Sequence, residues 1–105
     1  MLVQVKESSW IASIAARNLH AAKLAMVFGK KIYLFNTTRS EFLKNRRWVC
    51  HELVHVEQYA RYGMAGFLIR YLWETIRKGY HHNRFEVEAR QRENDERILQ
   101  GITIR

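Results

Sequence analysis

Proline is absent from this 105-residue sequence, and cysteine occurs once. The lone Cys50 excludes a disulfide within the chain and leads us to expect a reducing compartment, the cytoplasm. Glycine occurs only five times, and no internal repeat or low-complexity tract is present. Because linkers are usually rich in proline and glycine, the sequence predicts a single domain over residues 1–105.

Long apolar runs are also missing. The most apolar stretch, Met64 to Ile76, is interrupted by Arg70 and Glu74, so we expect no membrane span. A shorter apolar run over residues 10–16 is preceded by Glu7 and stopped by Arg17, which argues against a secretory signal peptide.

Basic residues exceed acidic ones by 18 to 10, giving a formal charge of +8. Such a surplus permits binding to nucleic acid, anionic membrane surfaces or acidic substrates. The basic residues are dispersed, however, as in the pairs Lys30-Lys31 and Arg46-Arg47, and several C-terminal arginines follow a glutamate by four positions. With no recognised basic motif, nucleic acid is not the partner that we expect.

The hydrophobic pattern predicts an α+β fold. The N-terminal half predicts a short strand over residues 2–5, a helix over 10–24 capped by Ser8 and Ser9, and a hairpin of strands 24–28 and 31–35. Helices over 41–62, 64–78 and 84–100 follow, then a β-like tail over 102–104. We expect a small antiparallel sheet packed on the 41–62 helix, with further helices on either side.

The predicted helix over residues 64–78 is very apolar. Its apolar residues recur at helical spacing, so we expect one face to point into the core, formed by Leu68, Ile69, Leu72, Trp73 and Ile76.

The strongest chemical signal is His51-Glu52-Leu53-Val54-His55, an H-E-x-x-H pattern within the 41–62 helix. Histidines four residues apart leave the same face of a helix, so both imidazoles can bind one cation. Glu52 is then placed to act on a metal-bound water. The packing stripe of this helix, through Val49 and Leu53, lies on another face, which leaves the histidines available.

A catalytic zinc site needs a third protein ligand. The candidates are His81 and His82, directly before the last helix, and Glu86 and Glu88 within it. The small Ala89 allows that helix to approach another helix closely. Around the helix axis, Glu86 is nearer to Ala89 than Glu88 is. The sequence therefore favours Glu86, with Glu88 as the alternative.

Together the two motifs, His51 to His55 and Asn83 to Ala89, resemble the zincin metallopeptidases of the gluzincin branch, and more narrowly small single-domain zincin-like peptidases. The resemblance covers about residues 31–92. It implies Zn²⁺ held by His51, His55 and Glu86, with Glu52 as general base.

The sequence departs from the larger families at Arg90, where they carry an aspartate that supports a histidine ligand. Glu93 lies two turns from Glu86 on the same side of the helix and is the candidate substitute.

These features predict a zinc metallopeptidase acting on a peptide or protein. His81 and His82 precede the ligand helix and are the expected oxyanion donors, and a peptide could add as a strand to the hairpin edge at about 31–35. The alternative is a zincin-like module that binds metal without catalysis, which the small size of the chain favours.

Overall fold

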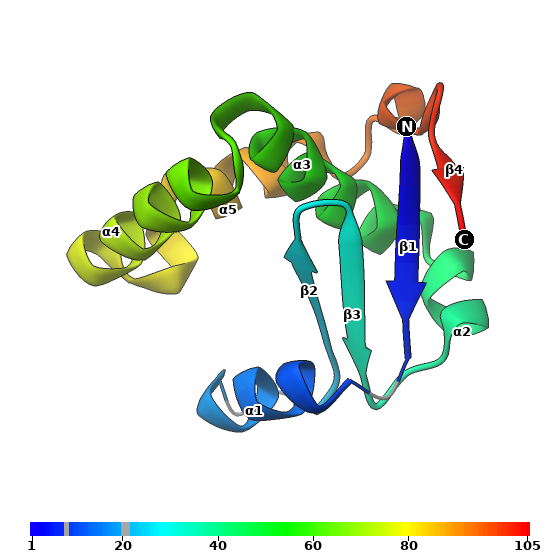
Figure 1. Cartoon of the computed structure of the whole chain (residues 1–105), viewed down its shortest axis with the longest axis horizontal. Helices are drawn as coiled ribbons and strands as arrows, with labels where there is room; N and C mark the ends of the chain where they lie inside the picture. Colours follow the sequence, from blue (N-terminus) through cyan, green and yellow to red (C-terminus); the bar gives the residue numbers. More distant parts are fainter. Residues whose placement is uncertain (8, 20–21) are drawn as a thin grey trace.

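The computed structural model describes residues 1–7, 9–19 and 22–105, in which helices pack around one small sheet (Figure 1). The strands are β1 (Leu2–Lys6), β2 (Leu24–Phe28), β3 (Lys31–Phe35) and β4 (Thr103–Ile104), in the order β2-β3-β1-β4. The predicted α+β class is confirmed, and the hairpin strands have the expected bounds. The sheet is mixed, however, because β1 pairs in parallel with both β3 and β4.

Strand β3 does not offer a free edge, contrary to expectation. It lies between β2 and β1, so that Ile32 is in register with Val27 on one side and Val5 on the other. The chain reaches β2 through a helical crossover from β1, which makes the parallel pairing possible. The free edge of the hairpin therefore belongs to β2.

Helix α1 (Trp10–Leu19) is shorter than the predicted helix, because Leu24 already belongs to β2. The Oγ of Ser9 accepts a hydrogen bond from the Ala12 N–H at 3.3 Å, as expected of a cap. The expected cap Ser8 and residues 20 and 21 of the predicted helix lie outside the described residues.

The predicted 41–62 helix is divided into α2 (Arg39–Lys44) and α3 (Arg46–Tyr62). The break falls at Asn45, whose side chain accepts from the Trp48 N–H at 3.1 Å and caps α3. An asparagine side chain competes with the backbone for such N–H groups, which explains why the helix restarts there.

Helix α4 (Met64–His82) runs regularly to Lys78, as predicted, and then breaks at Gly79, which adopts a φ of 80°. The left-handed conformation suits glycine and turns Tyr80 and the following residues back towards the domain. Helix α5 (Arg84–Arg92) is followed by a short 3-10 helix, η1 (Glu96–Leu99), so the predicted 84–100 helix was too long.

The main core lies between the sheet and α3, and a second aromatic cluster joins α3, α4 and α5. The first contains Ile32, Leu34, Phe42, Leu53 and Val56, and the second contains Tyr59, Phe67 and Phe85. Helix α3 is thus held on two sides, which fixes the orientation of the H-E-x-x-H residues.

Four of the five residues expected on the core face of α4 are exposed: Ile69, Leu72, Trp73 and Ile76. Leu68 is half-buried against the second cluster, and the buried apolar residue of α4 is Phe67. Helix α4 extends away from the sheet (Figure 1) and packs against α3 and α5. In the part of the chain that the structure describes, no helix is both long and apolar enough to cross a membrane.

Candidate metal centre

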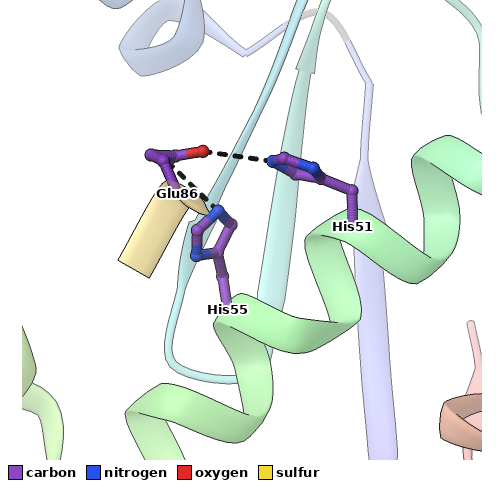
Figure 2. Close-up of side chains that lie close together, drawn as sticks. All are labelled: His51, His55 and Glu86. Carbon is purple, nitrogen blue, oxygen red and sulfur yellow. Dashed lines mark hydrogen bonds and ion pairs between the residues drawn. The ribbon is translucent and has the colours of Figure 1, made fainter. Parts of the chain in front are cut away.

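His51 and His55 project from successive turns of α3 towards Glu86 on α5, as Figure 2 shows. The Nε2 of His51 lies 3.1 Å from Glu86 Oε1, and the Nε2 of His55 lies 3.1 Å from Glu86 Oε2. One donor atom from each of the three residues falls within 4.8 Å of the others. The sequence-derived ligand set is therefore brought together across 35 residues of chain.

The spacing of these donors fits a metal ion. Three ligand atoms at zinc-bonding distance, arranged tetrahedrally, are about 3.3 Å from one another. The two nitrogen–oxygen separations of 3.1 Å are close to that value. Two imidazoles and a carboxylate are also a donor set that Zn²⁺ accepts.

Glu86 reaches the histidines because of how α5 begins. The Asn83 side chain accepts from the Phe85 N–H at 2.8 Å, which caps the helix and places Glu86 in its first turn. The Asn83 amide donates to the Tyr71 carbonyl and to Thr75 Oγ1, each at 3.0 Å, and so ties α5 to α4. The fully buried Ala89 allows close approach to α3, as its size predicts.

A hydroxyl that the sequence did not single out completes the surroundings of Glu86. Tyr71 donates to Glu86 Oε2 at 2.6 Å. Burial and the adjacent carboxylate raise the pKa of Tyr71, so its proton stays in place. Only the packing of α4 onto α5 brings this residue close, and no sequence motif marks it.

His55 is oriented by Gln58, which lies one turn along α3. The Gln58 amide nitrogen donates to the Phe85 carbonyl at 3.2 Å and to Glu88 at 2.9 Å. Its oxygen is thereby turned towards His55 Nδ1, 2.9 Å away, and accepts the Nδ1 proton. The Nε2 of His55 is left to face Glu86.

His51 is oriented by a carboxylate. Glu93 Oε2 lies 3.2 Å from His51 Nδ1, and Glu93 also pairs with Arg47 at 2.5 Å. The carboxylate thus has the position expected of the substitute for the missing aspartate. Arg90, which occupies the aspartate position, donates instead to the carbonyl of His81.

The electrostatics of the cluster favour a charged arrangement. Although burial opposes ionisation, hydrogen bonds from His51 and His55 hold the pKa of Glu86 well below its ordinary value. Burial likewise opposes protonation of His55, but the bond to Glu86 outweighs it and raises the His55 pKa to about 9. The same carboxylate raises the pKa of His51. The site therefore favours positive charge next to Glu86.

Glu52 lies beside this cluster and titrates in a different range. Burial raises its pKa to about 7, even though His55 and His51 act in the opposite direction. A carboxyl with a pKa near 7 can both accept and return a proton at neutral pH.

The site lies where two hollows meet along β2. An apolar cavity of about 330 Å³ extends between β2 and α4 and is bordered at one end by Glu52, His55 and Glu86. An open groove of about 480 Å³ is lined by His51 and Glu52 and includes Lys23 and Arg47. Leu24, Ala25 and Tyr80 also border both hollows.

The remaining expected site residues lie elsewhere. His81 and His82 are exposed at the end of α4 and border neither hollow. Glu88 accepts from Gln58 and pairs with Arg92 at 3.0 Å. It therefore helps to hold the Gln58 side chain that contacts His55. Tyr80, which directly precedes the two histidines, is the residue turned towards the site, because Gly79 redirects the chain there.

Neither protein-family models nor characterised proteins nor solved structures provide a match to this chain. The function is therefore inferred from the geometry of the site and from the resemblance of the motifs His51 to His55 and Asn83 to Ala89 to those of zincins.

Proposed function

We propose that this protein is a zinc-dependent peptidase whose metal ligands are His51, His55 and Glu86. The observation that carries the proposal is the convergence of the three donor groups, with both Nε2 atoms 3.1 Å from the Glu86 carboxylate. The resemblance of the H-E-x-x-H and Glu86 motifs to zincin peptidases supports the same conclusion.

Glu52 is the proposed general base. Bound Zn²⁺ supplies Lewis acidity, which activates water and polarises a carbonyl group. Glu52 follows the first ligand directly, and its carboxylate would accept the proton of the attacking water and pass it to the leaving amine. The peptide C–N bond breaks, and the water oxygen stays with the new carboxylate.

The position of β2 suggests how a peptide binds. All five residues of β2, Leu24–Phe28, border the apolar cavity, and β2 is an edge strand. An extended peptide could pair with that edge. It would then run from the cavity to the groove and lie next to Glu52, which borders both. The lining then favours an apolar side chain in the cavity and an acidic one near Lys23 and Arg47.

Tyr80 is the proposed donor to the developing oxyanion, in place of the expected His81 and His82. It borders both hollows next to Glu52. Loss of hydration, together with the carboxylates of Glu86 and Glu52, raises the pKa of its phenol, so the hydroxyl keeps its proton and can donate.

The test compares wild type with Glu52→Gln, using zinc content and cleavage of a fluorogenic peptide library. The proposal expects both proteins to bind one zinc ion and only the wild type to cleave. Glu96→Gln, an exchange of an exposed glutamate that pairs with Arg46 and borders neither hollow, is the matched control and should keep its activity. A zinc-loaded wild type without hydrolysis would contradict the peptidase proposal.

A metal-binding module without catalysis is the second candidate. Its supporting observation is that His55, Glu52 and Glu86 are all buried, as is usual for structural sites. In that case Glu52→Gln changes nothing measurable, whereas His51→Ala lowers the thermal stability of the zinc-loaded protein.

A further inference from the structure

Four large apolar side chains form a row on the outer surface of α4. Ile69, Leu72, Trp73 and Ile76 are 69%, 58%, 59% and 77% exposed. Their spacing of three and four residues puts them on one helix face, which we call the α4 stripe. Isolated exposed apolar residues are common, but a contiguous row of four marks an interaction surface.

The stripe is flanked by cations. Arg70 and Arg77 are exposed beside it, and the guanidinium of Arg77 lies 6.0 Å from the centre of the Trp73 ring. The acidic residue of α4, Glu74, is buried, pairs with Lys78 at 3.4 Å and accepts from the Arg84 N–H at 3.1 Å. The side of the stripe that carries Arg70 and Arg77 is therefore positive.

We propose that the α4 stripe docks on an anionic lipid bilayer. An interfacial helix inserts apolar side chains at the acyl boundary and keeps arginine and lysine at the headgroup phosphates, with tryptophan suited to the interface between them. The row of isoleucine, leucine and tryptophan next to Arg70 and Arg77 has this composition. The chain charge of +8 adds longer-range attraction to an anionic surface.

Charge also argues for a bilayer over a second copy of the chain. Two stripes packed together would bring the cations beside each stripe into proximity, where like charges repel. A bilayer containing acidic lipid offers an apolar layer and negative headgroups at once.

Docking needs no metal, and so goes beyond the proposed peptidase activity. It does have a consequence for the cavity, because Leu72 belongs to the stripe and also borders the cavity next to Leu68. The apolar hollow thus opens beside the surface that would meet the lipid. If the proposed function also holds, apolar or membrane-bound peptides are the substrates that this arrangement favours.

The experiment is sedimentation of the full chain with large vesicles of phosphatidylcholine, with or without phosphatidylglycerol. Wild type should sediment with the anionic vesicles, sediment poorly with neutral ones, and bind less as salt is added. Ile69→Ser/Ile76→Ser should weaken binding by at least about tenfold, since both side chains would lose their burial in lipid. Arg70→Gln/Arg77→Gln should weaken binding to anionic vesicles while the four apolar side chains of the stripe are kept.

The matched control is Trp10→Ser/Ile14→Ser on α1, which removes two side chains that are 72% and 52% exposed, away from α4. This variant should bind vesicles like wild type, and so should Glu86→Gln, because docking is independent of the metal centre. All replaced side chains except Glu86 are exposed, so circular dichroism should show folded variants.

Three results would overturn the proposal. One is the absence of binding to anionic vesicles, and another is equal loss of binding in the α1 and α4 variants. The third is a concentration-dependent dimer, without vesicle binding, that Ile69→Ser/Ile76→Ser dissociates; this would assign the stripe to a second copy of the chain.

Discussion

Gln58 Oε1 lies 2.9 Å from Nδ1 of His55. Gln58 itself cannot rotate freely, because its amide nitrogen donates to Phe85 and Glu88 on α5. The helix that supplies Glu86 therefore also fixes, through Gln58, the orientation of a histidine on α3. The contact between α3 and α5 thus places Glu86 next to the histidines and also sets which ring nitrogen of His55 carries the proton.

Replacing Gln58 by methionine keeps much of the volume and removes these hydrogen bonds. We expect zinc affinity to fall by about 10- to 100-fold, because His55 is no longer held with Nε2 towards the metal. Competition with a chromophoric chelator measures the change. Gln91→Met, at an exposed position of α5, is the control, and an equal loss in both variants would contradict the role of Gln58.

Glu93 supports His51 in the corresponding way. Glu93→Gln should lower zinc affinity by about tenfold or more, since a neutral amide is a weaker acceptor for His51 Nδ1. Glu96→Gln makes the same chemical exchange at an exposed pair with Arg46 and should leave affinity within a factor of about two. Unchanged affinity in Glu93→Gln would show that the carboxylate does not support the ligand.

Zinc affinity should depend on pH in a direction set by His55. The pKa of His55 in the metal-free protein is raised from 6.5 to about 9, so a proton competes with the metal for Nε2 up to that pH. We expect affinity to rise by about tenfold or more per pH unit from about 6.5, and to level off above about 9. Chelator competition in a pH series tests this, and constant affinity over that range would contradict it.

Asn83 should matter for stability, because it caps α5 and joins it to α4. Asn83→Ala removes the cap and the two hydrogen bonds that the Asn83 amide donates to the Tyr71 carbonyl and to Thr75 Oγ1, which should cost about 2–4 kcal/mol in the free energy of unfolding. Thr38→Ala, at the exposed cap of α2, should cost about 1 kcal/mol. Urea unfolding of the metal-free proteins gives both values, and similar losses would contradict a joining role for Asn83.

The proposed ligands His51 and His55 were predictable from the sequence because their geometry is local. Four-residue spacing on a helix fixes how His51 and His55 project, whatever the rest of the fold does. Glu86 was favoured over Glu88 by its angle to the small Ala89 and by the resemblance to zincins, and the structure brings its carboxylate to 3.1 Å from the Nε2 atoms of both histidines.

The predictions that failed, and the contacts that were missed, depended on how the helices pack against one another. The apolar period of α4 correctly predicted a helix but could not tell which face has a neighbour, so Ile76 and Trp73 were assigned to the core. The break at Asn45 was missed because a cap inside a long periodic run resembles an ordinary polar position. Tyr71 reaches Glu86 only through packing between helices, which leaves no trace in the local sequence.

The central claim is that His51, His55 and Glu86 bind one metal ion, and zinc titration by calorimetry tests it most directly. Wild type should bind one zinc ion per chain. Glu86→Gln should lose tight binding, whereas Glu88→Gln, the neighbouring alternative, should keep one zinc ion with at most modestly reduced affinity. Absence of zinc uptake by the wild type, or full retention of binding in Glu86→Gln, would contradict the account.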